Sequence, residues 1–273
     1  MKNPYEHLVI YYFESVPVLP VGLESDGRFL GSWEEDGTAF LFFNQAAEDV
    51  VSGVLDANPT VALADTYEMS CEQWHGDEIK SYSVADLTVS PPWEAAGTDR
   101  EIFLDPGVVF GSGRHPTTEE CLGLIHRLCT EEQIDSVLDI GTGTGLLALG
   151  AAALGCRRIM ACDFNLLAVK TCLKNVRLNH FEDRILSFQA RGETQMEIPC
   201  DLLVANIHYD VMRFLIESPA LETKKWMIFS GLLNSEARKI MDRLKERNIH
   251  VLQRRCPDGV WNTLLARPAF FLD

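Results

Sequence analysis

The sequence lacks several features that would place it in a broad class of protein. Its 273 residues contain no apolar run approaching the roughly 20 residues that cross a bilayer. The N-terminal stretch MKNPYEHLVIYYFE has no small-residue cleavage site and carries Glu6 in its apolar part, unlike a secretory signal peptide. The eight cysteines form no C-x-x-C pair and show no metal-ligand spacing. We therefore expect no membrane association, no metal site and a cytoplasmic protein with reduced core thiols.

Positive charge is scarce in the first third of the chain. Residues 1–100 hold 4 Lys and Arg against 18 Asp and Glu, whereas residues 101–273 hold 20 against 22. Binding to a nucleic-acid backbone needs a cationic surface, so we expect no direct nucleic-acid binding. The acidic third could steer a basic protein partner, or it could simply be a solvated acidic face, and the composition leaves both open.

The chain does contain one stretch with a strong local pattern, from Ser136 to Asp163. A short apolar run predicts a buried strand, which leads through Gly141, Gly143 and Gly145 into a Leu- and Ala-rich segment of helical period. A second apolar run ends on Asp163, 22 residues after Gly141. The pattern predicts a parallel βαβ unit whose glycine turn approaches a ligand and whose terminal acid can hold two ribose hydroxyls.

The glycine spacing favours one ligand over another. The dinucleotide fingerprint is G-x-G-x-x-G, but here the third glycine comes one place early and Leu146 takes its position. The form D-x-G-x-G-x-G, with Asp139 before the turn, is closer to the pattern of S-adenosylmethionine (AdoMet) methyltransferases. An acid beside the loop suits the cationic sulfonium and α-amino group of AdoMet, whereas a bare helix N-terminus suits pyrophosphate. AdoMet is favoured, with a nicotinamide site and a ligand-free turn as the alternatives.

Around this unit the sequence predicts two unequal parts. Residues 1–66 predict a small acidic α+β domain, residues 67–100 a linker segment, and residues 101–273 an AdoMet-binding methyltransferase domain. After the central unit, βα repeats and a terminal antiparallel hairpin predict seven strands. The expected fold is an α/β, doubly wound, Rossmann-like sheet with the last strand antiparallel. Ligands bind at the carboxyl ends of such strands, which places Gly141, Asp163 and Asn206 on one rim.

A second informative stretch is EIFLDPGVVFGSGRHPTT, residues 101–118. It combines a strand, a glycine loop able to fold over a ligand, and the start of a helix. Thr117, followed three residues later by Glu120, predicts a capping box that opens a helix to about Cys129. His115 in such a position is more often a loop-packing histidine than a catalytic base.

Four segments together resemble the ribosomal protein L11 methyltransferase (PrmA) family: LDPGVVFGSGRHPTT, VLDIGTGTG, the acid Asp163 and the strand end ANI at residues 205–207. The resemblance covers roughly residues 67–267 and is poor over residues 1–66, where that family has its substrate-recognition domain. It implies AdoMet-dependent methyl transfer, with S-adenosylhomocysteine as product, to an amine nitrogen of a basic protein, a ribosomal protein.

The resemblance also implies site residues. It assigns AdoMet contacts to Thr118, Gly141, Asp163 and Asn206, with Phe110 and Gly111 near the cofactor and substrate entrance, and the glycine pattern adds Asp139, Gly143 and Gly145. Asn206 is the candidate that orients the incoming amine.

The sequence departs from the family after ANI, where His208 replaces the usual aliphatic residue. His208 is a candidate proton acceptor, or a surface histidine at a helix start. The same fold could instead methylate a small molecule or another protein. A catalytically silent AdoMet-binding module, assembling through its acidic N-terminal part, is the alternative from a different class.

Overall fold

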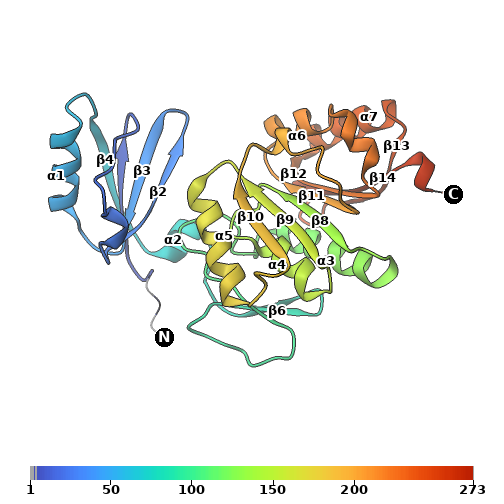
Figure 1. The fold of residues 1–273 in the computed structure, drawn as a ribbon, viewed down its shortest axis with the longest axis horizontal. Coiled ribbons are helices and arrows are strands. Elements are labelled where there is room, and N and C mark those ends of the chain that lie inside the picture. Colours follow the sequence, from blue (N-terminus) through green and yellow to red (C-terminus); the bar gives the residue numbers. More distant parts are fainter. Residues whose placement is uncertain (1–2, 4, 273) are drawn as a thin grey trace.

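The computed structural model describes residue 3 and residues 5–272 of the chain (Figure 1). A small sheet with one helix, drawn in blue, lies beside a larger body built on a wide sheet. A segment that includes the short helix α2 (Cys71–His75) passes between them.

The N-terminal part is an antiparallel sheet in the order β2-β3-β1-β4, with one helix on one face. Alternate residues of β1, including Val9 and Tyr11, pack toward that helix together with Leu41 of β3. Asp36 and Gly37 both have positive φ in the tight turn that joins β2 and β3 into a hairpin. The elements are β1 (Leu8–Phe13), β2 (Phe29–Glu35), β3 (Thr38–Phe43), α1 (Glu48–Ala57) and β4 (Leu63–Met69).

The other face of this small sheet is turned to the larger body. Leu8, Ile10 and Phe42 form a buried apolar cluster with Val108 and Leu167 of the larger body. Burial of these side chains holds the two parts together through the hydrophobic effect. The contact fixes β2 and β3 beside the loop that follows residue 105.

The larger body is built on a seven-stranded sheet in the order β10-β9-β8-β11-β12-β14-β13. The strands from β10 to β12 are parallel, and β14 is antiparallel to both of its neighbours. Because β14 is the last strand of the chain, the predicted seven strands with the last one reversed are confirmed. The chain leaves β8 toward β9 and β10 and returns at β11, which places the topological switch point between β8 and β11. The strands are β8 (Ser136–Ile140), β9 (Arg158–Asp163), β10 (Ile185–Gln189), β11 (Leu202–Asn206), β12 (Trp226–Leu233), β13 (Ile249–Arg255) and β14 (Trp261–Pro268).

Helices cover both faces of this sheet. Side chains alternate along each strand, so Val204 packs on the side of α3, α4 and α5, while Ala205 packs on the side of α6 and α7. The Asn165 side chain caps the helix that follows it by accepting the Leu167 N–H at 2.8 Å. The helices are α3 (Pro116–Glu131), α4 (Leu146–Ala153), α5 (Leu166–Leu178), α6 (Tyr209–Leu215) and α7 (Asn234–Glu246), with short 3₁₀ turns at Leu23–Ser25, Gly192–Thr194, Pro219–Thr223 and Ala269–Phe271.

A third, three-stranded sheet covers α3 and α4. It consists of β5 (Tyr82–Val84), β6 (Leu87–Ser90) and β7 (Glu101–Phe103), and it buries Leu87 and Ile102 in the same core as those helices. Much of the segment predicted as a linker therefore packs on the larger body, while β4 continues to Met69. Over residue 3 and residues 5–272, no helix combines the length and the apolar character needed to span a bilayer.

Candidate active site

The turn between β8 and α4 brings the chain back on itself at three glycines. Gly141, Gly143 and Gly145 have φ values of 70°, 54° and 88°, in the left-handed region that glycine adopts without strain. A Cβ on Gly143 would lie 2.7 Å from the Phe110 carbonyl oxygen, and one on Gly145 would lie 2.7 Å from the Cys172 sulfur. The turn therefore needs glycine both for its conformation and because other segments approach it closely.

Asp163, at the end of β9, lies directly against this turn. Its Oδ2 accepts the Gly143 N–H at 3.0 Å and its Oδ1 accepts the Asn165 N–H at 3.0 Å. The side chain is 9% exposed, and burial raises its pKa above the ordinary range. A carboxylate can accept about four hydrogen bonds, so Asp163 keeps acceptor capacity for the hydroxyls of a ribose.

Asp139, within β8, is almost fully buried, and one of its carboxyl oxygens lacks a partner in the described part of the chain. Its Oδ2 accepts the Thr142 hydroxyl at 2.6 Å, but Oδ1 has no hydrogen-bond partner among the described residues. Burial raises the pKa of Asp139 to about 7. An unpaired carboxylate oxygen in this setting is costly unless a cation or donor meets it. This carboxylate oxygen therefore fits a ligand that carries positive charge.

The loop after β7 lies over the glycine turn. The Thr144 hydroxyl donates to the Gly111 carbonyl at 2.7 Å, and this bond joins the loop to the turn. Phe110, the residue before, is 62% exposed and covers this edge of the sheet. The structure thus brings Phe110 and Gly111 to the same place as the glycine turn and Asp163.

Asn206, at the end of β11, is held by the start of α3. Its Nδ2 donates to the Thr117 hydroxyl at 3.2 Å and lies 3.5 Å from the Thr118 hydroxyl. The Thr117 hydroxyl in turn lies 2.7 Å from His115 Nδ1. These contacts engage the amide nitrogen, and Asn206 Oδ1 has no hydrogen bond within the described part of the chain. The carbonyl oxygen therefore remains available to accept a hydrogen from a substrate amine.

His115 is packed between two aromatic rings. Its ring centroid lies 5.7 Å from that of Phe110 and 5.4 Å from that of Trp261. Burial lowers the pKa of His115, against an opposing influence of Asp258. The ring is therefore neutral at pH 7, and Nδ1 can accept the Thr117 hydroxyl hydrogen.

The start of α3 corrects one expectation from the sequence. The N-cap is His115 and not Thr117, and the helix begins at Pro116. The His115 side chain accepts the Thr117 N–H. Proline is favoured at the first helical position, and this signal competes with the capping-box pattern. Thr117 thus lies in the first turn and contributes its hydroxyl to Asn206, a contact that the sequence analysis missed.

His208 lies apart from this hydrogen-bond network. It precedes α6, its side chain caps nothing, and it is exposed. No hydrogen bond from its ring is present among the described residues. Its neighbour Ile207 packs against Gly141, where a Cβ would lie 2.2 Å from the Ile207 methyl carbon. His208 therefore borders the site from the solvent side.

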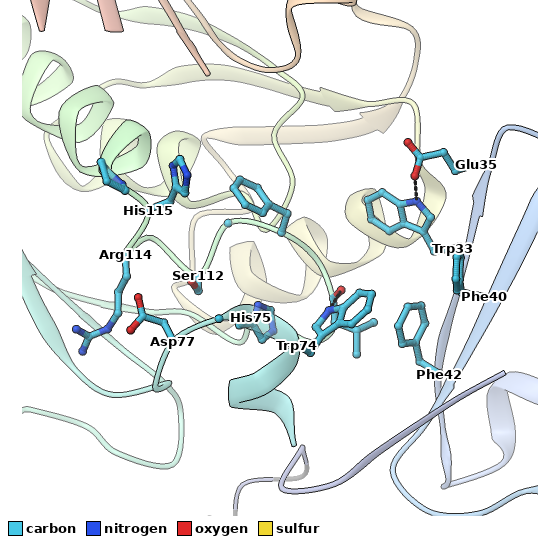
Figure 2. A pocket seen from close by; sticks show the side chains of 15 residues that line it. Trp33, Glu35, Phe40, Phe42, Trp74, His75, Asp77, Ser112, Arg114 and His115 are labelled. Atoms are coloured by element: carbon cyan, nitrogen blue, oxygen red, sulfur yellow. Dashed lines mark hydrogen bonds between the residues drawn. The ribbon is translucent and has the colours of Figure 1, made fainter. Parts of the chain in front are cut away.

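A cleft of about 620 Å³ opens beside this site, between the small sheet and the loop (Figure 2). Phe110 and His115 line one end, and Trp33 of β2 lines the other. Trp74 of α2 donates its indole N–H to the Val108 carbonyl at 2.9 Å and packs edge-on against Phe42. These two contacts anchor Trp74 in place.

Solved structures share this architecture. The human methyltransferase 10 domain containing protein aligns with a TM-score of 0.52 over 62% of this chain and 90% of that chain, at 17% identity. The ribosomal protein L11 methylase of Lactobacillus delbrueckii subsp. bulgaricus aligns with a TM-score of 0.62 over 69% of this chain and 99% of that chain, at 28% identity. The fold is that of a Rossmann-like methyltransferase.

Sequence comparison names the family within that class. The family model for ribosomal protein L11 methyltransferase (PrmA) matches residues 36–268. The enzyme of that name from Desulforamulus reducens is 33% identical over 220 residues, which is 77% of this chain and 70% of that protein. The one from Streptococcus pneumoniae is 27% identical over 294 aligned positions, covering 96% and 92%. The chain belongs to the ribosomal protein L11 methyltransferase family, and it is a methyltransferase.

The match also extends further than the motifs do. The resemblance seen in the sequence begins at about residue 67, whereas the family match begins at residue 36, in the turn between β2 and β3 of the small sheet. The family match therefore includes β3, α1 and β4 of the small sheet, while β1 and β2 precede it.

Proposed function

We propose that this chain transfers methyl groups from AdoMet to an amine nitrogen of a basic protein, with ribosomal protein L11 as the substrate. The observation that carries the proposal is the Asn206 amide. Its nitrogen is held by Thr117, and its oxygen accepts no hydrogen bond from residue 3 or residues 5–272, at the strand end next to the glycine turn. Such an amide can orient an amine without binding its lone pair.

The cofactor part of the proposal is supported by the residues around the glycine turn. Asp163 would hold the ribose, Asp139 would meet the positive charge, and Gly141, Gly143 and Gly145 would let the backbone approach. Phe110, Gly111 and Thr118 would close the site from the α3 side. Bound AdoMet supplies a methyl group on a cationic sulfur, which leaves as a neutral thioether.

The accepting amine must lose a proton before it can accept a methyl group. At pH 7 this costs about 4.6 kcal/mol for a lysine, but only about 1 to 1.4 kcal/mol for an N-terminal amine, from their ordinary pKa values. Burial beside another positive charge lowers both costs, because each disfavours the charged amine. A dedicated base is therefore optional. His208 is the candidate to take up the released proton at the solvent side.

Positioning is the larger requirement. Holding two reactants in line can contribute about 7 to 11 kcal/mol toward the barrier. In this proposal Asn206 Oδ1 accepts one hydrogen of the amine, which turns the nitrogen lone pair toward the methyl group. Thr117 and His115 hold the amide in that orientation.

The choice of substrate is supported by charge and by the names of the relatives. Residues 1–100 carry a large excess of acidic side chains, which favours encounter with a basic protein. In this proposal residues 1–66 serve in substrate recognition and residues 101–273 in catalysis. Ribosomal proteins are made in the cytoplasm, so the proposal places the enzyme there.

The test is a labelling experiment with radioactive AdoMet. The chain is incubated with purified L11 and, separately, with cell extract, and AdoMet binding is measured by calorimetry on the same preparation. Label on L11 that is lost in Asn206→Leu, even when AdoMet is present at a saturating concentration for that variant, supports the proposal. Label only on small molecules or on other proteins contradicts the substrate. No label with intact AdoMet binding indicates a silent module and contradicts the activity.

A further inference from the structure

The cleft between the two parts of the chain has aromatic walls on the side away from the site. Trp33 and Phe40 face each other across β2 and β3, and both are half-buried. Trp74 is 38% exposed and contributes a third ring from α2. Figure 2 shows these rings gathered at one end of the cleft, opposite His115.

Neighbouring contacts hold these rings in place. Phe40 stacks on Tyr12 with ring centroids 4.7 Å apart and an interplanar angle of 18°. The Trp33 indole N–H donates to Glu35 Oε2 at 3.2 Å, and Trp74 donates to the Val108 carbonyl. Rings that are already ordered lose little freedom when a ligand packs on them.

The charges in the cleft favour a cation at the aromatic end. Glu35 brings a carboxylate beside Trp33. The cationic group, Arg114, is engaged elsewhere: it donates to the Lys80 carbonyl at 3.2 Å and lies 5.0 Å from the centre of the Tyr82 ring. The second histidine of the cleft, His75, has its pKa lowered by burial and contacts the Gly107 carbonyl at 3.0 Å.

We propose that this cleft binds an alkylammonium side chain of the protein substrate, a lysine or its methylated form, other than the amine that accepts the methyl group. Aromatic faces attract an ammonium group through the ring quadrupole, and a carboxylate at the edge completes such a site. The inference rests on the proposed function for the identity of the substrate. The binding chemistry itself rests on Trp33, Phe40, Trp74 and Glu35.

The cleft adjoins the proposed reaction site. Its other end is lined by Phe110 and His115, and His115 connects through Thr117 to Asn206. A substrate segment lying along the cleft has one cationic side chain against the rings while another amine reaches Asn206. The cleft then contributes to substrate affinity and leaves the chemical step unchanged.

The direct test uses small probes and the full chain. Nα-acetyl-lysine amide, its trimethyl derivative and the neutral Nα-acetyl-norleucine amide are titrated while tryptophan fluorescence and heat are recorded. We expect both cationic probes to bind more tightly than norleucine amide. Trp33→Leu and Phe40→Leu should each weaken cationic binding by about tenfold. Tyr67→Leu, on β4 outside the cleft lining, is the matched control and should bind as the unchanged chain does.

Four outcomes decide between support and refutation. The proposal is overturned if norleucine amide binds as tightly as the cationic probes. It is also overturned if Trp33→Leu and Phe40→Leu both bind the cationic probes as the unchanged chain does while AdoMet affinity is preserved. An increase in KM for L11 in Trp33→Leu at constant kcat supports it. Because the probe titration involves no methyl transfer, Trp33-dependent cation binding without L11 methylation supports the cleft and contradicts the proposed function alone.

Discussion

Replacing Thr117 with valine removes one hydroxyl and keeps the shape of the side chain. Thr117 is 2% exposed, and its hydroxyl lies between Asn206 Nδ2 at 3.2 Å and His115 Nδ1 at 2.7 Å. After the change, the remaining oxygen near Asn206 Nδ2 is that of Thr118 at 3.5 Å, which is at the limit of a hydrogen bond. The amide then loses the contact that fixes its orientation.

The magnitude follows from two separate effects. Leaving a buried polar group unpaired costs about 1 to 3 kcal/mol of folding stability, and the isosteric side chain adds no cavity term. A misplaced positioning group can slow a reaction by about 100-fold, equivalent to about 2.7 kcal/mol in the barrier. We therefore expect the rate of methyl transfer to fall by about 10- to 100-fold in Thr117→Val, with the protein still folded.

The assay is a single-turnover measurement with saturating L11 and labelled AdoMet, together with AdoMet binding by calorimetry. Thr118→Val is the matched control, since the neighbouring hydroxyl is the one assigned to AdoMet. Thr117→Val should lower the single-turnover rate and leave AdoMet affinity within about threefold. Thr118→Val should instead weaken AdoMet binding.

The reasoning is refuted if Thr117→Val transfers methyl groups at a rate within about twofold of the unchanged chain. It is also refuted if both variants weaken AdoMet binding equally, because the two hydroxyls would then share one role. Urea unfolding of each variant separates a loss of rate from a loss of folded protein.

Three further predictions concern the glycine turn and its two acids. Burial raises the pKa of Asp139 to about 7, so the neutral carboxyl stabilises the fold fully below about pH 4, and this stabilisation is lost as pH rises through the raised pKa. Asp139→Asn should therefore flatten the pH dependence of the free energy of urea unfolding between about pH 4 and pH 7. AdoMet affinity should also rise with pH through neutrality in the unchanged chain and stay flat in that variant, which calorimetry at several pH values would show. Asp163→Ala should weaken AdoMet binding at least tenfold, and equal affinity in calorimetry would contradict the assigned ribose contact. Gly143→Ala would place a Cβ at a position of positive φ and against the Phe110 carbonyl oxygen. The control is Gly259→Ala, also at positive φ, where a Cβ meets nothing within 4 Å and the expected destabilisation is about 1 to 2 kcal/mol. Gly143→Ala should destabilise the fold by more than this control, and equal melting temperatures for the two variants would contradict the prediction.

Local patterns in the sequence predicted the central part of the fold well. The βαβ unit from Ser136 to Asp163 is present with its glycine turn, and the reversed last strand β14 lies between β12 and β13. These features depend on hydrophobic period and on glycine conformation, which neighbouring residues determine.

Predictions failed or remained incomplete where distant segments meet. Thr117 was interpreted as a cap because the pattern to Glu120 is local, whereas its hydroxyl belongs to a contact with Asn206, 89 residues away. The packing of Leu87 against α3 and α4 likewise depends on a core that no short window shows. The hydrophobic periodicity of a segment does not show which distant hydroxyl group an amide side chain will contact.

The sequence by itself determined the class of fold, the family, and the carboxyl-end rim on which Gly141, Asp163 and Asn206 lie, because strand and turn patterns are encoded within a few residues. Only the tertiary structure decided which oxygen of Asp139 stays unpaired, how the Asn206 amide is oriented, and that an aromatic cleft adjoins the site. Those properties arise from contacts between segments far apart in the chain, and their energies are set by burial, which exists only once the chain has folded.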